Sequence, residues 1–105
     1  MRSMINVPKT AKAGEIIEIK TMIAHPMETG YRTGTNGTTI PRNIITRFVC
    51  TYDGEEVFSA DLFPAVAANP LIAFTTVALR SGTLTFAWTD DSGATQSESV
   101  EIVVA

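Results

Sequence analysis

Two residues carry side chains that could perform nucleophilic chemistry together. Cys50, the only cysteine, lies in the segment RFVCTY, and His25 is the only histidine. A cysteine nucleophile requires a thiolate, and a histidine held nearby is a common base for generating it. Alternation along the segment, however, places Cys50 on the same side as Phe48 and Tyr52, the side expected to face a core. We therefore expect Cys50 to be buried and unreactive and His25 to be a local hydrogen-bonding group, with no catalytic residue in the chain.

The acidic residues occur as two adjacent pairs, Glu55-Glu56 after one turn and Asp90-Asp91 inside another. Neighbours on a strand point to opposite faces, so neither pair forms an acid–base dyad, and we expect both pairs to be solvated turn residues. The segment DDSGATQSE lacks the spaced acidic ligands of a calcium loop. A single cysteine and a single histidine also exclude multi-cysteine and two-histidine metal sites, so we expect no metal and no cofactor.

The remaining candidates gather in and beside a long loop. Residues 25–42, HPMETGYRTGTNGTTIPR, separate two strong strand segments, and loops longer than about 12–15 residues are usually functional or disordered. Tyrosine and arginine are favoured at protein interfaces because each offers a large contact area with a polar tip. The predicted partner-binding residues are His25, Glu28, Tyr31, Arg32, Arg42 and Arg47. The same residues also fit ordinary loop solvation, and the sequence leaves both interpretations open.

The elements that must position these residues are strands. Residues 15–24 alternate, with Ile17, Ile19 and Ile23 on one face, which predicts a half-buried strand. Segments 43–52 and 55–62 flank Asp53-Gly54, a dipeptide typical of a two-residue hairpin, and segments 83–89 and 94–105 flank the acidic turn at residues 90–93. Further strands are expected at 2–7 and 71–79, and the stretch from Phe63 to Ala68 is expected to be a connection.

About seven strands at this spacing predict an all-β sandwich of antiparallel strands. Leu84, Phe86 and Trp88 share one face of their segment and are expected in its core. The length of 105 residues, with 45% hydrophobic and 18% charged residues, predicts a single domain covering residues 1–105.

Charge and hydropathy exclude several classes of partner. The chain has 8 basic and 11 acidic residues, a net charge of -3 and no basic run, so we expect no nucleic-acid partner. No stretch approaches the roughly 18 apolar residues of a membrane helix, so we expect no membrane insertion. The start, MRSMINVPKTAKAGE, lacks the apolar stretch of about 7–15 residues that a secretory signal requires. Taken alone, these observations predict the cytoplasm.

Three segments together resemble the SoxZ family, a subunit of the sulfur-oxidation carrier complex. They are PKTAKAGEIIEIKTMIAHPMETGYR at 8–32, IPRNIITRFVCTYDGEEVFSADLFPAVAANP at 40–70 and GTLTFAWTDDSG at 82–93. The most specific parts are HPMETG, FVCTYDGEEVFSADL and ANP, which occur in family order and spacing. The loop interior from Thr33 to Thr39 departs from the pattern, because it is rich in threonine and glycine where relatives often carry charges.

The resemblance implies an immunoglobulin-like β-sandwich that acts as a noncatalytic scaffold. In that family the partner subunit SoxY carries thiosulfate-derived sulfur covalently on a cysteine of a glycine-rich C-terminal arm. This chain ends in EIVVA, so it resembles SoxZ rather than the carrier. The implied partners are SoxY, as a heterodimer, and transiently the other sulfur-oxidation enzymes. The implied location is the periplasm, reached by co-export with SoxY, which replaces the cytoplasmic expectation.

Two alternatives from other functional classes remain at this stage. The first is a freestanding immunoglobulin-like binding module with no role in sulfur oxidation, which would be a stable monomer indifferent to SoxY. The second is an enzyme that uses Cys50, which would show a reactive thiol and activity without a partner. The sequence leaves open the interface residues, the stoichiometry and whether the isolated subunit self-associates.

Overall fold

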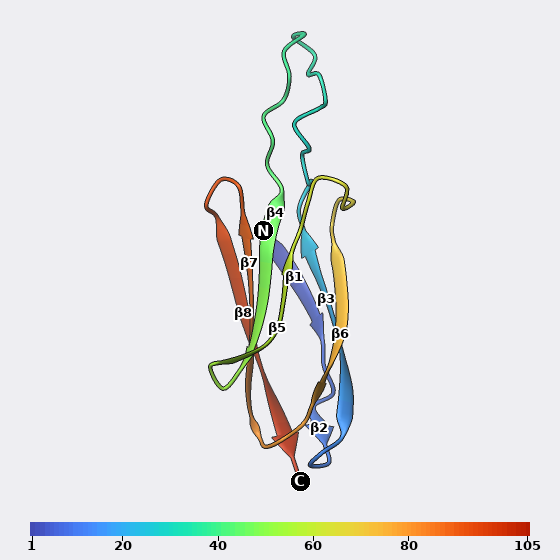
Figure 1. Cartoon of the computed structure of the whole chain (residues 1–105), viewed down its shortest axis with the longest axis vertical. Helices are drawn as coiled ribbons and strands as arrows, with labels where there is room; N and C mark the ends of the chain where they lie inside the picture. The colour runs from blue at the N-terminus through green and yellow to red at the C-terminus, as the bar shows by residue number, and fades with distance from the viewer.

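The computed structural model describes all 105 residues and consists of two packed β-sheets without a helix (Figure 1). One sheet has the order β1 (Arg2–Asn6), β3 (Ile16–Ala24), β6 (Leu71–Val77). The other has the order β2 (Thr10–Ala11), β8 (Thr95–Val104), β7 (Gly82–Asp90), β4 (Ile45–Tyr52), β5 (Glu55–Asp61). The predicted all-β sandwich is confirmed. No helix is present that is long and apolar enough to cross a membrane.

The sandwich has eight strands rather than about seven, and one of its pairings is parallel. The additional strand, β2, runs parallel to the end of β8, with Thr10 opposite Val103 and Ala11 opposite Val104. Two residues are too few to show an alternating pattern, so no periodic signal marks this strand. Its existence depends on a partner at the far end of the chain.

The predicted core faces are confirmed on both sheets. Ile17, Ile19 and Ile23 of β3 are buried, as are the three predicted core residues of β7. Cys50 is fully buried between Phe48 and Tyr52 on the inward face of β4. Seventeen buried hydrophobic side chains form a single cluster between the sheets. The alternation in the sequence therefore marks which face of each strand is inside.

Aromatic rings join the two sheets at the centre of the core. The ring of Phe48 lies 5.2 Å from that of Trp88 and 6.0 Å from that of Phe74, centroid to centroid. Phe58 of β5 and Phe74 of β6 stack at 4.3 Å with planes 8° apart. This stack links one strand from each sheet along the side where β5 and β6 face each other.

Both predicted hairpins are present. Asp53 and Gly54 have φ values of 50° and 85° between β4 and β5, the left-handed pair that a two-residue turn requires. In the second hairpin β7 extends through Asp90, whose amide donates to the carbonyl of Ala94 at 3.0 Å. The second turn therefore begins one residue later than predicted.

The long loop is an ordered hairpin that projects from one end of the sandwich, opposite the C-terminus (Figure 1). Its two sides pair through bridges between Glu28 and Asn43 and between Thr33 and Thr39. The amide of Ile40 also donates to the carbonyl of Arg32 at 2.8 Å. We call residues 26–44 the projecting hairpin. It contributes to an elongated molecule with principal extents of 58 × 19 × 19 Å.

Candidate functional site

The base of the projecting hairpin rests on a buried histidine. His25 follows the last residue of β3 and is 4% exposed. Its Nδ1 accepts the backbone N–H of Met27 at 3.0 Å, and its Nε2 lies 3.2 Å from Oδ2 of Asp90. Because Nδ1 is used as an acceptor, the ring proton of the neutral imidazole lies on Nε2 and is donated to Asp90. The prediction of a local hydrogen-bonding role for His25 is confirmed.

Asp90 is buried, which corrects the prediction that it is a solvated turn residue. It is 6% exposed at the end of β7. Its Oδ1 accepts the hydroxyl of Ser92 at 2.6 Å and the amide of Ala94 at 3.1 Å. Burial raises the pKa of Asp90, but the hydrogen bonds from Ser92, His25 and Ala94 outweigh it and hold the pKa below its usual value. A charged carboxylate is therefore stable in this buried position.

The signal for Asp90 was present in the sequence. Leu84, Phe86 and Trp88 occupy alternate inward positions of β7, and continuing that alternation by two residues places Asp90 inward as well. The acidic pair indicated a turn more strongly than the alternation indicated burial. Only Asp91 of the pair lies in the turn.

Asp91 holds the returning side of the hairpin. Its Oδ2 accepts the backbone N–H of Ile44 at 3.1 Å and Nε of Arg42 at 2.9 Å, and its own amide donates to the carbonyl of Ile44 at 3.0 Å. The hydrogen bond from Arg42 lowers the pKa of Asp91. The acidic turn of the second hairpin thus anchors Arg42 and fixes where the projecting hairpin returns to the sheet.

The outgoing side is held by Asn69, which the sequence analysis did not single out. The backbone amide of His25 donates to the Asn69 side chain at 3.0 Å, and the Asn69 amide donates back to the carbonyl of His25 at 2.8 Å. Met27 adopts a φ of 51°, and its sulfur accepts the amide of Ile45 at 3.2 Å. Asn69 lies in the connection before β6, so sequence distance conceals this contact.

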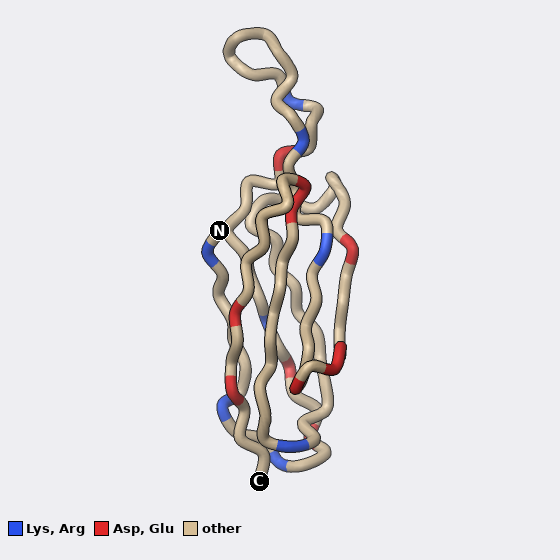
Figure 2. The backbone as a smooth tube through the Cα atoms, turned by 90° about the vertical axis from the view of Figure 1, so that its left-hand side faces the viewer, with Lys and Arg blue, Asp and Glu red and all other residues tan.

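Three of the predicted partner-binding residues lie together on the hairpin. Nη2 of Arg32 donates to Oε1 of Glu28 at 2.6 Å. This hydrogen bond lowers the pKa of Glu28 and raises that of Arg32. Tyr31, between them in sequence, is 84% exposed. Beyond Arg32, residues 33–41 contain no charged side chain, and Figure 2 shows the charges gathered near the base with an uncharged tip.

The other predicted residues are placed differently. Arg42 lies on the returning side of the hairpin and pairs with Asp91. Arg47 lies on β4, where it pairs with Asp61 at 2.9 Å and Glu56 at 3.7 Å across the strand pair. The side chain of His25 supports the hairpin from beneath. The structure therefore brings Glu28, Tyr31, Arg32 and Arg42 to one projection, with His25 below it and Arg47 on the adjoining sheet.

A cysteine–histidine catalytic pair does not form. Burial raises the pKa of Cys50 to about 12, so the thiolate is strongly disfavoured. Both ring nitrogens of His25 already have partners, Met27 and Asp90. No group of three or more His, Cys, Asp or Glu side chains is arranged to hold a metal ion.

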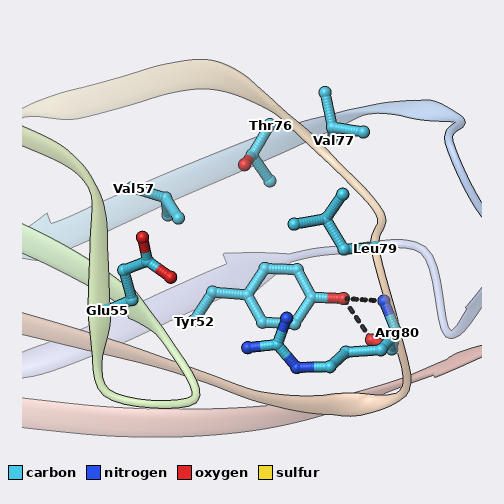
Figure 3. A pocket seen from close by; sticks show the side chains of 7 residues that line it. All are labelled: Tyr52, Glu55, Val57, Thr76, Val77, Leu79 and Arg80. Carbon is cyan, nitrogen blue, oxygen red and sulfur yellow. Dashed lines mark hydrogen bonds between the residues drawn. The ribbon is translucent and has the colours of Figure 1, made fainter.

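An open hollow of about 200 Å³ lies between β5 and β6 (Figure 3). Tyr52 is one of the residues that line it, and its hydroxyl donates to the carbonyl of Arg80 and accepts the backbone N–H of Arg80. The Arg80 guanidinium lies 5.6 Å from the Tyr52 ring centroid and bonds to Asp53 at 3.1 Å. These contacts join Tyr52, Asp53 and Arg80 at this part of the sandwich, so we assign Tyr52 and Arg80 a structural role there.

The projecting hairpin is the candidate interaction site. Comparison with known proteins identifies a matching family. Residues 5–101 match the family described as "SoxZ: Sulphur oxidation protein SoxZ". No curated protein matches the chain.

Several solved structures share the fold. A superoxide reductase (neelaredoxin) from Ignicoccus hospitalis has a TM-score of 0.78 and 18% identity, covering 98% of this chain and 79% of that chain. A putative superoxide reductase from Thermotoga maritima has a TM-score of 0.75 and 18% identity, with coverage of 98% and 85%. The sulfur carrier protein SoxY from Chlorobium limicola f thiosulfatophilum has a TM-score of 0.69 and 14% identity, with coverage of 98% and 78%.

At these identities the structural likeness concerns the fold alone. The family match is of a different kind, because it is a match of sequence that spans nearly the whole chain and includes both sides of the projecting hairpin and both predicted hairpins. The resemblance carried by HPMETG and FVCTYDGEEVFSADL is thereby confirmed, and the chain belongs to the SoxZ family of sulphur oxidation proteins.

Proposed function

We propose that this chain is a noncatalytic binding subunit that pairs with SoxY and helps present its covalently bound sulfur intermediates to the other enzymes of thiosulfate oxidation. Membership of the SoxZ family supports the sulfur-oxidation role. A pKa of about 12 for the only thiol supports a role without its own nucleophile. We further propose that the complex works in the periplasm after co-export with SoxY, for which cell fractionation is the test.

The observation that carries the proposal is an anchored hairpin projecting from a rigid sandwich. Function resides disproportionately on loops that a rigid scaffold positions. The base is tied to the sandwich by His25, Asp90, Asp91 and Asn69, so the hairpin projects without needing to order itself on binding. A preorganised contact element loses less conformational entropy when it binds.

The side chains on the hairpin suit a protein partner with an anionic cargo. Tyr31 offers an exposed aromatic surface, which is favoured at interfaces. Arg32 and Arg42 are each in an exposed ion pair, but a guanidinium has five N–H donors and retains donors for a further oxyanion. A sulfur adduct held on a carrier arm would be anionic and could accept them through charge-assisted hydrogen bonds.

The decisive experiment shortens the hairpin without disturbing its base. Residues 33–39 are replaced by Asn-Gly, which joins Arg32 to Ile40, where a backbone hydrogen bond already pairs the two sides. We expect an unchanged unfolding midpoint and at least about a tenfold loss of affinity for SoxY or of thiosulfate-dependent turnover in the reconstituted pathway. Wild-type affinity and turnover in this variant would show that residues 33–39 take no part in the proposed function.

Single substitutions distinguish residues that bind SoxY from residues that orient its sulfur adduct. Tyr31→Ala is expected to weaken binding to SoxY, while Leu79→Ala, at an exposed position near the opposite end of the sandwich, serves as the matched control. Arg32→Ala and Arg42→Ala are expected to lower turnover more than affinity. A chain that forms no complex with SoxY at all would favour the freestanding binding module instead.

A further inference from the structure

Strand β6 presents an unpaired edge with an unusual composition. Its sequence, LIAFTTV, contains no charge, glycine or proline. It pairs with β3 on one side and with no strand on the other. Native proteins normally protect such an edge with charges, prolines or covering segments, because exposed backbone groups are a template for pairing with another chain. The opposite sheet follows this rule at β5, which begins with Glu55 and Glu56 and ends with Asp61.

The register shows which backbone groups the edge offers. At one end of the β3–β6 ladder the amide of Ile23 donates to the carbonyl of Pro70, and at the other the amide of Ala78 donates to the carbonyl of Glu15. Antiparallel bonding alternates, so Ile72, Phe74 and Thr76 bond toward β3. The N–H and C=O groups of Leu71, Ala73, Thr75 and Val77 therefore point to the free edge. Outside the ladders these groups have no hydrogen-bond partner in the chain.

Two rows of apolar side chains, all exposed except the half-buried Met22, cross the outer face of the same sheet. Met4, Met22 and Leu71 are opposite one another at one end of β6, and Ile16 and Val77 are opposite at the other. Exposure reaches 61% at Met4, 67% at Leu71 and 70% at Ile16. Leu71 and Val77, where the rows meet β6, are equally far in sequence from Phe74. A two-fold rotation about Phe74 therefore exchanges the two apolar ends of the strand, Leu71 and Val77.

We propose that two copies of this chain pair through β6, antiparallel, about a two-fold axis at Phe74. Leu71 then lies opposite Val77 of the second copy, and Ala73 lies opposite Thr75. Every outward N–H and C=O on this edge gains a partner, and the three-stranded sheets of the two copies become continuous. The row of Met4, Met22 and Leu71 is extended by the second copy's Val77 and Ile16, so the two separate apolar rows meet.

The occupant is a second copy because the pattern complements itself. A two-fold interface requires that one surface patch match its own rotated image. The central rows place small side chains, Ala73 and Thr75, at the contact, with Lys20 of one copy in the same row as Glu18 of the other. No like charges oppose each other across the junction. In this dimer the two projecting hairpins point in opposite directions, away from the contact. Pairing through β6 uses a different surface from the proposed function, and its test is separate from that of the projecting hairpin.

A disulfide cross-linking experiment tests the register. Leu71→Cys and Val77→Cys chains are prepared separately and oxidised alone and mixed. Within one chain the two positions are about 20 Å apart and cannot bond, but across the two-fold axis they lie at a spacing that suits a disulfide. Covalent dimer is expected from the mixture and not from either variant alone; Cys50 is buried and does not take part. Equal cross-linking of each variant alone, or none in the mixture, overturns the proposal.

Sedimentation of the complete chain tests the contact itself. Thr75→Pro removes an outward N–H without breaking the bonds to β3, and is expected to weaken dimerisation at least about tenfold. Ser59→Pro is the matched control, because the backbone N–H of Ser59 also points to a free edge, that of β5 in the other sheet. The Trp88 fluorescence transition confirms that both variants fold. A wild-type chain that remains monomeric at millimolar concentration, or equal weakening by both prolines, overturns the proposal.

Discussion

At the residue scale, the contact between His25 and Asp90 joins the projecting hairpin to the sandwich. A buried carboxylate is costly unless hydrogen bonds compensate it. Here the imidazole, the Ser92 hydroxyl and two backbone amides supply them. The same imidazole accepts the Met27 amide through its other nitrogen. One buried side chain thereby connects the end of β7 to the first residues of the projecting hairpin.

This contact predicts a dependence of stability on pH. The pKa of Asp90 is lowered in the folded state from an ordinary value of 3.8, so the unfolded chain binds the proton more tightly. The stabilisation is complete above about pH 4 and is lost as the pH falls through the folded-state pKa. Urea titrations between about pH 2 and pH 7 are expected to show a shallower acid decline for Asp90→Asn than for wild type. Asp61→Asn, on the exposed edge strand, is the control, and identical slopes for wild type and Asp90→Asn would contradict the assignment.

Cys50 gives a second prediction at the same scale. With its pKa raised to about 12 by burial, the thiolate fraction at pH 8 is about one in ten thousand, and the side chain is shielded as well. Iodoacetamide is expected to label the native protein far more slowly than the urea-unfolded protein, followed by mass spectrometry. Labelling of the native chain at the rate of a free thiol would revive the enzyme alternative that depends on this residue.

At the element scale, the projecting hairpin depends on a close approach between its two sides. Gly30 has a φ of 90°, and a Cβ at this position would lie 2.9 Å from Cβ of Arg42. Gly37, near the tip, has a φ of 81° but open space around it. The first glycine is required by both conformation and space, and the second by conformation alone.

Alanine at each glycine separates these two requirements. Both substitutions place a side chain in the left-handed region, at a cost of about 1–2 kcal/mol. Gly30→Ala adds a steric conflict, so we expect it to open the hairpin base further. Amide hydrogen exchange at Glu28 and Asn43, which bond to each other across the hairpin, is the measurement. Equal exchange in the two variants would show that the approach of Gly30 to Arg42 does not hold the base together.

At the scale of the whole molecule, the hairpin makes a small sandwich unusually long. The Cα radius of gyration is 16.1 Å, whereas a compact domain of this size has about 13 Å. The difference reflects chain placed beyond the end of the core, where it buries little surface. Ordering these residues costs conformational entropy, and the hydrogen bonds at the base of the projecting hairpin offset that cost.

Small-angle scattering checks this shape. At dilutions where the chain is monomeric, we expect wild type to give a radius of gyration clearly above that of a compact domain. Replacement of residues 33–39 by Asn-Gly should move it toward about 13 Å. A hairpin folded back against the sheets in solution would give the compact value for both proteins. That outcome would contradict the projecting geometry while leaving the sandwich intact.

The sequence by itself determined every strand except β2, the apolar inward faces of the main strands, and the family. Alternation along β3, β4 and β7 is a local property with a period of two residues, so it identified Ile17, Cys50 and Trp88 as core residues. The Asp53-Gly54 turn is equally local. The family followed from motifs that recur in order along the chain, and the match over residues 5–101 confirmed it. The partner-binding role of the loop residues stays a prediction.

Only the tertiary structure decided what joins the hairpin to the sandwich. His25 and Asp90 are 65 residues apart, Asn69 lies in a different connection, and β2 pairs with the far end of the chain. Such contacts depend on sheet order and register, which place distant segments side by side, and no local pattern encodes them. Asp90 combines both kinds of contact: Ser92 and Ala94, which bond to its Oδ1, are close in sequence, whereas His25, which bonds to its Oδ2, is brought to it only by the tertiary fold.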